Sequence, residues 1–243
     1  MVAIAAGFEG GLAVLAWLLG WAFSYPPANE IRWALADVGY AVLWTLPLIP
    51  AMVFIGRSNW RPFVRIQQVV NAIVVPLFSG CSVFQLAMIS ALAGIGEEAL
   101  FRGFIQNSLA TEGNVWGGII IAGFLFGLAH MITPAYAVLA TLMGVYFGWL
   151  MHFHDNLLVA IMVHALYDFI ALLYLVRINP RSPAILRRSM DDMEQLIEAR
   201  MSQSDDFEPP DDPAEGKDRE SKDVQRRAIE LRENLCRETP ACP

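Results

Sequence analysis

The sequence predicts an all-α membrane protein: a bundle of about six transmembrane helices followed by a mostly disordered, acidic C-terminal tail. Of the 243 residues, 56% are hydrophobic and only 17% are charged, which is too apolar for an average soluble domain. The apolar residues form runs close to the ~20 residues that a helix needs to cross a bilayer. The charged residues collect in short loops and after residue 190.

The first two apolar runs form a predicted N-terminal helical hairpin, which we assign to residues 1–66. The first run covers residues 2–23 and ends before a Pro-Pro pair, because proline cannot continue the helical hydrogen-bond ladder. The second run, residues 34–55, contains two prolines that we expect to kink it. Residues 56–65 carry three arginines, so we expect a cytoplasmic loop there.

Residues 67–178 form the predicted core of the protein. An apolar stretch at 66–78 is short and carries polar residues, so we expect an interfacial or re-entrant helix. Four further spans are predicted at 81–109, 116–131, 135–151 and 157–176, with turns at 111–114 and 152–156. Two spans precede the arginine-rich loop and four follow it, so the chain begins and ends on the same side of the membrane as that loop. We therefore expect both termini in the cytoplasm.

The remaining residues, 179–243, are expected to form an acidic, largely disordered cytoplasmic tail, because this segment has little to bury. The formal net charge of −7 comes mostly from this tail. No basic patch with interleaved aromatic residues is present, so we expect no nucleic-acid partner. Short loops and the lack of a targeting segment favour a multi-pass protein of a bacterial inner (plasma) membrane.

Charged residues inside the apolar runs carry the functional prediction. Glu97, Glu98 and Arg102 interrupt the 81–109 span, although an ionisable group at bilayer depth costs roughly 2.5–3.5 kcal/mol. Glu98 and Arg102 are four residues apart and share a helix face, so we expect a structural ion pair. Glu97 is rotated from Glu98 by about 100° and is left for chemistry.

Two other spans carry polar residues that could converge with Glu97. His130 ends one span, and His164 and Asp168 lie four residues apart on the last one. One hypothesis is a zinc site with Glu97, His130, His164 and Asp168 as ligands, because two histidines, a carboxylate and an open position form a catalytic zinc arrangement. In the other, without metal, Glu97 and His130 activate water, while His164 and Asp168 stabilise the oxyanion.

Both chemistries end in hydrolysis of a carbonyl compound, most naturally a peptide bond. The soluble zinc-protease signature His-Glu-x-x-His is absent, and so is the Gly-x-Ser-x-Gly turn of serine hydrolases. His152 and His154 lie in a predicted turn without matched spacing, so we expect both to be solvated.

Three segments resemble motifs of the CAAX-protease and bacteriocin-processing (CPBP, or Abi) family of intramembrane endopeptidases. Residues 97–102, 126–130 and 164–168 resemble its Glu-Glu-x-x-x-Arg, Phe-x-x-x-His and His-x-x-x-Asn/Asp motifs. The resemblance implies that Glu97 activates water with His130 as its partner. It also implies that Glu98 and Arg102 form a supporting pair, and that His164 and Asp168 complete the polar cluster.

Members of this family have been described both as metalloproteases and as metal-independent glutamate proteases, so zinc and no metal both stay open. Many relatives have asparagine where this chain has Asp168. Ionised aspartate only accepts hydrogen bonds, which suits a metal ligand or a group that fixes the tautomer of His164.

The sequence thus predicts an intramembrane endopeptidase that cleaves a membrane-associated protein or peptide. Two other functions remain open. One is a non-catalytic membrane scaffold or bacteriocin-immunity-type binding protein. The other is an ion-coupled transporter, against which the sequence shows no internal repeat.

Overall fold

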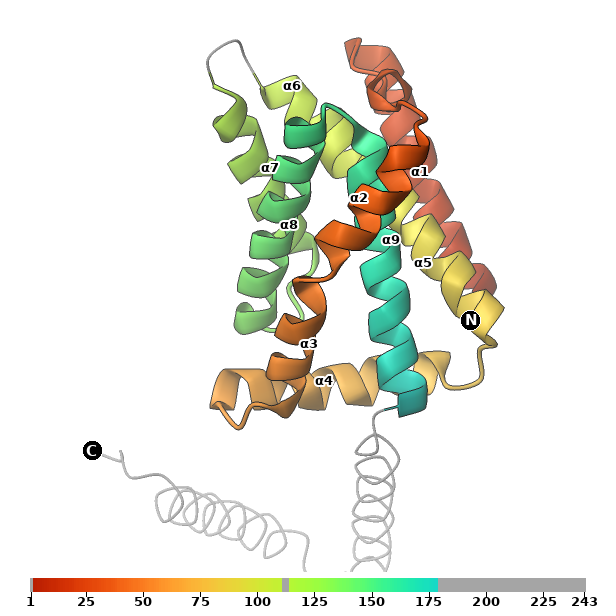
Figure 1. The fold of residues 1–243 in the computed structure, drawn as a ribbon, viewed down its shortest axis with the longest axis vertical. Helices are drawn as coiled ribbons and strands as arrows, with labels where there is room; N and C mark the ends of the chain where they lie inside the picture. Colours follow the sequence, from red (N-terminus) through yellow and green to blue (C-terminus); the bar gives the residue numbers. More distant parts are fainter. Residues whose placement is uncertain (1, 111–113, 179–243) are drawn as a thin grey trace, which may run out of the picture. The chain divides into compact units, whose positions relative to one another are not determined.

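The computed structural model describes residues 2–110 and 114–178, and within them it contains helices and no strand (Figure 1). The predicted all-α fold is therefore confirmed. The predicted tail at 179–243 and most of the predicted turn at 111–114 lie outside the described residues. The division of the chain at residues 66 and 178 stays a prediction.

Five helical segments within the described residues are long and apolar enough to cross a membrane. They are α1 (Val2–Phe23), α2 with α3 (Leu35–Arg57), α5 with η2 and α6 (Val83–Leu109), α8 (Pro134–His154), and α9 with η3 (Leu157–Ile178). Helix α7 (Val115–Ala129) is also apolar but has only 15 residues. With α7, the helices match the six predicted spans, and the protein is a multi-pass membrane protein.

The second span is interrupted at Pro47, one of the two prolines at which a kink is predicted, while Leu46 and Pro47 keep right-handed helical backbone angles. Helix α2 (Leu35–Thr45) ends before Pro47, and α3 (Leu48–Arg57) begins after it. Proline removes a backbone donor from the helical hydrogen-bond ladder, which explains a break at this position. A short 3₁₀ helix, η1 (Pro27–Glu30), lies between α1 and the extended residues that precede α2.

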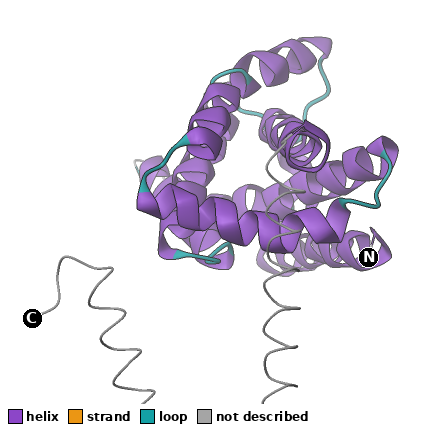
Figure 2. Ribbon diagram, turned by 90° about the horizontal axis from the view of Figure 1, so that it is seen from below, coloured by secondary structure: helices purple, strands orange, loops and turns teal. Residues whose placement is uncertain are grey.

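Helix α4 (Arg61–Phe78) crosses one end of the bundle, as an interfacial helix would (Figures 1 and 2). The predicted loop at 56–65 is therefore wrong in part, because Arg61 and Arg65 lie inside α4 and only residues 58–60 connect it to α3. Pro62 lies in the first turn of α4, where its missing N–H group costs nothing.

The third span begins with a capping box: the Ser82 hydroxyl accepts from the Gln85 amide, and the Gln85 side chain accepts from the Ser82 amide. It continues as α5 (Val83–Glu98), the π-helical η2 (Ala99–Gln106) and α6 (Asn107–Leu109). π-helical turns are rare and occur often at functional sites. Here the π-helix begins directly after Glu97 and Glu98.

Glycines bring pairs of helices into close contact around this span. A Cβ at Gly94 of α5 would lie 2.8 Å from the Ile161 carbonyl oxygen of α9 (Leu157–Leu173), and one at Gly144 of α8 would lie 2.8 Å from Gly123 Cα of α7. Small residues allow such close backbone contacts between membrane helices. Helix α5 therefore packs directly on α9, and α7 on α8.

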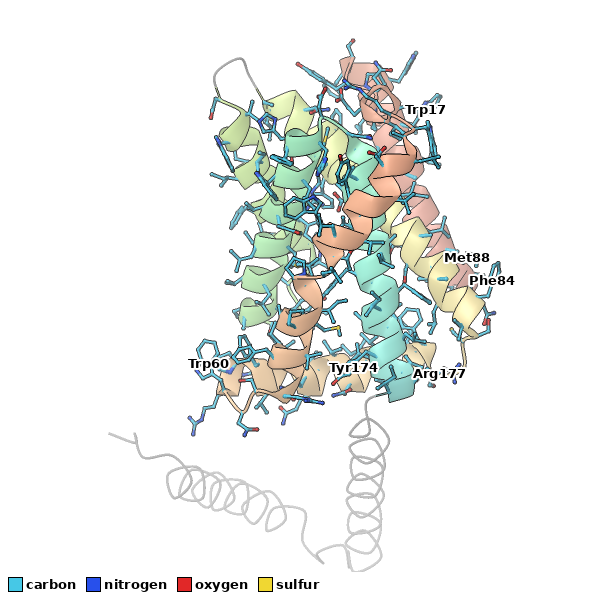
Figure 3. The ribbon with its side chains drawn as sticks, viewed as in Figure 1. Trp17, Trp60, Phe84, Met88, Tyr174 and Arg177 are labelled. Atoms are coloured by element: carbon cyan, nitrogen blue, oxygen red, sulfur yellow. The ribbon has the colours of Figure 1, made fainter. Side chains whose placement is uncertain are left out.

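The outer surface is apolar, as expected of a surface that faces lipid. Trp17 is 59% exposed and Phe84 is 77% exposed. Figure 3 shows Trp17, Phe84 and Met88 pointing away from the bundle. At the end of the chain that the structure describes, η3 (Tyr174–Ile178) carries Arg177, whose Nη2 donates to the Cys81 carbonyl oxygen (2.7 Å) and joins the last span to the third.

The predicted turn at 152–156 is shorter than expected, because α8 continues to His154 and only Asp155 and Asn156 separate it from α9. Asp155 has φ = 48°, the left-handed conformation that ends a helix. His154 is not simply solvated as predicted, since its Nε2 accepts a hydrogen bond from Trp44 Nε1 (2.8 Å). His152 is exposed, as predicted.

Candidate active site

Glu98 and Arg102 form an ion pair inside the bundle. Arg102 Nη1 lies 2.8 Å from Glu98 Oε1, and both side chains are fully buried. The same Glu98 oxygen lies 2.7 Å from His164 Nδ1 on α9. The expected pair is thus present, but it is part of a three-residue network that joins α5, η2 and α9.

The Arg102 guanidinium also binds α8. Its Nη2 donates to the Gly144 carbonyl oxygen (2.9 Å), and its Cζ lies 4.4 Å from the centre of the Phe126 ring and 5.5 Å from that of Phe147. A buried guanidinium is costly unless it is paired and hydrogen-bonded, and aromatic faces add cation–π attraction. Arg102 therefore holds four helical segments together.

Glu97 has a different environment from that of Glu98. Its side chain is about nine-tenths buried, yet its Oε2 has no hydrogen-bond partner in the protein. The nearest base is His130 Nε2, 3.5 Å from that oxygen. This is longer than a good direct hydrogen bond, so the two groups are close but not bonded to each other.

The orientation of the His130 ring is fixed by its other nitrogen. Nδ1 lies 2.9 Å from the Phe126 carbonyl oxygen, and a carbonyl oxygen only accepts, so Nδ1 carries the hydrogen. In the neutral ring, Nε2 then carries a lone pair that is directed toward Glu97. The ring also stacks on Phe126, with centroids 4.3 Å apart, so His130 is held at the end of α7.

His164 is buried between two carboxylates. Its Nδ1 contacts Glu98, and its Nε2 lies 3.4 Å from Asp168 Oδ2 one turn further along α9. The Phe147 ring stacks on the imidazole at 4.9 Å between centroids. Asp168 is the more open member of the pair, with its side chain 34% exposed.

The structure therefore brings the six predicted site residues together as two groups. The first is Glu98, Arg102, His164 and Asp168, and the second is Glu97 and His130. Within residues 2–110 and 114–178, no three His, Cys, Asp or Glu side chains are close enough to hold a metal ion. Whether Glu97, His130, His164 and Asp168 bind zinc stays a prediction.

Three residues near this cluster were not among the predicted ones. Glu9 of α1 interacts electrostatically with Glu97, His164 and Asp168. Tyr136, in the first turn of α8, interacts with Glu97 and Asp168, and Tyr167 of α9 interacts with Asp168 and Tyr136. Glu9 had a detectable signal in the sequence, because it is the charged residue of an otherwise apolar span. Tyr136 and Tyr167 had no such signal in the sequence.

Comparison with protein-family models matches residues 79–170 to the family described as Type II CAAX prenyl endopeptidase Rce1-like. This segment is Rce1-like. The match is consistent with the CPBP family and confirms the resemblance predicted from the three motifs. The Rce1-like segment contains all six predicted site residues and, with the apolar helices, supports a membrane-embedded endopeptidase. Comparisons with curated proteins and with solved structures gave no match.

Proposed function

We propose that this protein is an intramembrane endopeptidase in which Glu97 is the general base that activates water. One observation carries the proposal: Glu97 Oε2 is buried without a partner and faces His130 Nε2 at 3.5 Å. A water that enters as these two side chains move about 1 Å apart would donate one hydrogen to each acceptor. Removal of a proton by Glu97 would leave hydroxide directed at a carbonyl carbon.

The second group would stabilise the negative charge that develops on the carbonyl oxygen. His164 Nε2 lies 3.4 Å from Asp168, whose side chain is 34% exposed. When Nε2 carries a hydrogen it can donate to the oxyanion. Glu98 and Arg102 would not touch substrate, since both are fully buried.

The substrate class follows from the location of the site. Glu97 lies in a span that is apolar on its outer face, so a peptide bond can reach it only from the membrane or its surface. We therefore propose a membrane-associated protein or peptide as substrate, with the lipid bilayer as its environment. No step of this reaction runs through a metal ion.

The first test is peptide cleavage by the purified protein in detergent, measured with a quenched peptide library. Glu97→Gln should lower kcat/KM by about 10²–10⁴-fold, the usual contribution of a general base. Its melting temperature should stay at the wild-type value, because glutamine has the same shape. Glu30→Gln, an acid between α1 and α2, is the control and should cleave normally.

The second test measures metal content and activity in the same samples. We expect cleavage to survive a strong zinc chelator and to need no stoichiometric zinc. Zinc at one ion per chain that is lost together with activity in the His164→Ala, Asp168→Ala double variant would overturn the metal-free mechanism. Full activity in Glu97→Gln would overturn the proposed function.

A further inference from the structure

Glu9 is a carboxylic acid that the proposed reaction does not yet use. It is the charged residue of α1, a 22-residue apolar helix, and it lies outside the segment that matches the family model. A charged side chain in a membrane helix normally faces the bundle interior or a wet cavity and serves a function.

Packing places Glu9 beside the turn of α5 that carries Glu97. A Cβ at Gly96 would collide with the Glu9 backbone oxygen and would lie 3.4 Å from Leu12 Cβ. Glycine at position 96 therefore allows the backbone of α1 to touch α5 one residue before Glu97.

The Glu9 carboxyl group forms no ion pair with any residue that the structure describes. Its Oε2 is buried without a hydrogen-bond partner. Arg102 is already bound to Glu98, and His164 is held between Glu98 and Asp168. Glu9 is half-buried and, unlike Glu97, has no histidine nitrogen against it within the described residues. Among other carboxyls such a group is less costly as the neutral acid, and a neutral acid can donate a proton.

We infer that Glu9 is a second catalytic residue, the general acid that protonates the leaving nitrogen of the scissile peptide bond. This inference rests on the proposed function. Hydrolysis of an amide needs such a donor, because an amine anion is too poor a leaving group to depart without a proton. Glu97 starts the reaction as a base, so a second carboxyl that starts as an acid fills the missing role.

The proton balance closes with these two carboxyls. Water oxygen bonds to the carbonyl carbon as one water proton passes to Glu97. The C–N bond then breaks, its electron pair stays on nitrogen, and nitrogen takes the proton of Glu9 as the carbonyl re-forms. The products are a carboxylic acid and an amine. Transfer of the proton from Glu97 to Glu9 through water restores both groups.

Two substrates with the same acyl peptide test this assignment. One ends in a peptide bond, and the other ends in a p-nitrophenyl ester, whose leaving group departs without a proton. With Glu9→Gln we expect kcat/KM for the peptide to fall by about 10²-fold or more, whereas hydrolysis of the ester stays within about threefold of wild type. Glu97→Gln should lower both, because both need activated water.

Two further variants separate catalysis from packing. Glu9→Asp keeps a carboxylic acid and should recover part of the peptide activity, and Glu30→Gln should cleave both substrates normally. Melting temperatures of all variants are measured in the same detergent.

Three results would overturn the inference. Equal loss of peptide and ester hydrolysis in Glu9→Gln would assign Glu9 to packing. Unchanged peptide cleavage in that variant would remove it from the reaction, with the proposed function intact. Failure of Glu97→Gln to lower either activity would overturn the proposed function and this inference together.

Discussion

Glu97 and Glu98 are adjacent in the chain but differ in almost every contact that they make. One oxygen of Glu98 contacts both Arg102 and His164, at 2.8 and 2.7 Å, and the side chain is fully buried. Each side chain has one buried oxygen without a hydrogen-bond partner, Oε2 in both cases, but the nearest base to Glu97 is His130, at 3.5 Å. The same functional group, shifted by one residue, is paired with an arginine in one case and has no ion pair with an arginine or lysine in the other.

The difference follows from the helical period. One residue of helix turns a side chain by about 100°, so Glu98 faces α9 and the Arg102 side chain while Glu97 faces the end of α7 and α1. A neutralised carboxylate can hold helices together but is a poor base. The variants below remove contacts of Glu98, of Glu97 and then of the helices around them.

The largest expected effect on stability is that of Arg102→Ala. This variant leaves Glu98 buried with His164 as its remaining partner, removes the bond to the Gly144 carbonyl oxygen and empties the space over Phe126. Breaking a buried pair costs about 3–5 kcal/mol. The free energy of unfolding in detergent, monitored through the loss of helical signal, should fall by this amount. Wild-type stability and activity would contradict the supporting role of the pair.

A mainly kinetic effect is expected for His130→Phe. Phenylalanine preserves stacking on Phe126 but removes the Nε2 lone pair that faces Glu97. We expect kcat/KM to fall by about 10²-fold, with unfolding free energy within about 1 kcal/mol of wild type. The exposed His152 provides the control, since His152→Phe should change neither quantity. A fall in stability without a fall in activity would place His130 with the structural group.

A smaller loss of stability is expected for Gly144→Ala. The added methyl group would lie 2.8 Å from Gly123 Cα and 3.1 Å from Arg102 Nη2, so α7 and α8 must separate. Inserting a methyl group into a packed contact costs typically about 1–3 kcal/mol. Gly39→Ala in α2 is the matched control, because nothing lies within 4 Å of its Cβ position. Equal melting temperatures for the two variants would argue against this close contact.

The smallest effect is expected for His154→Ala, which removes the acceptor of the Trp44 indole hydrogen bond. One hydrogen bond contributes about 0.5–1.5 kcal/mol. His152→Ala, two residues away on the same helical turn, should have no measurable effect. A chemical-denaturation series on the two variants measures the difference. Equal stability would show that the Trp44 contact contributes nothing, and that both histidines behave as the solvated residues that the sequence favours.

The sequence by itself determined the features that depend on one helix. Apolar runs of about 20 residues located the spans, and the four-residue spacing of Glu98 and Arg102 predicted their ion pair, because the helical period fixes which side chains share a face. The three motifs also lie within the segment that matches the Rce1-like family, so residue identity and spacing were enough to recognise it. The roles of Glu97, His130, His164 and Asp168 in the reaction stay predictions.

Only the tertiary structure decided which helices share those side chains. It placed His164 on Glu98, joined His154 to Trp44 and brought Glu9 of α1 beside Glu97 through the missing side chain of Gly96. It also placed His164 between the carboxylates of Glu98 and Asp168. Contacts between helices depend on the register and depth of each helix in the bundle, and residue spacing along a single helix carries no information about either.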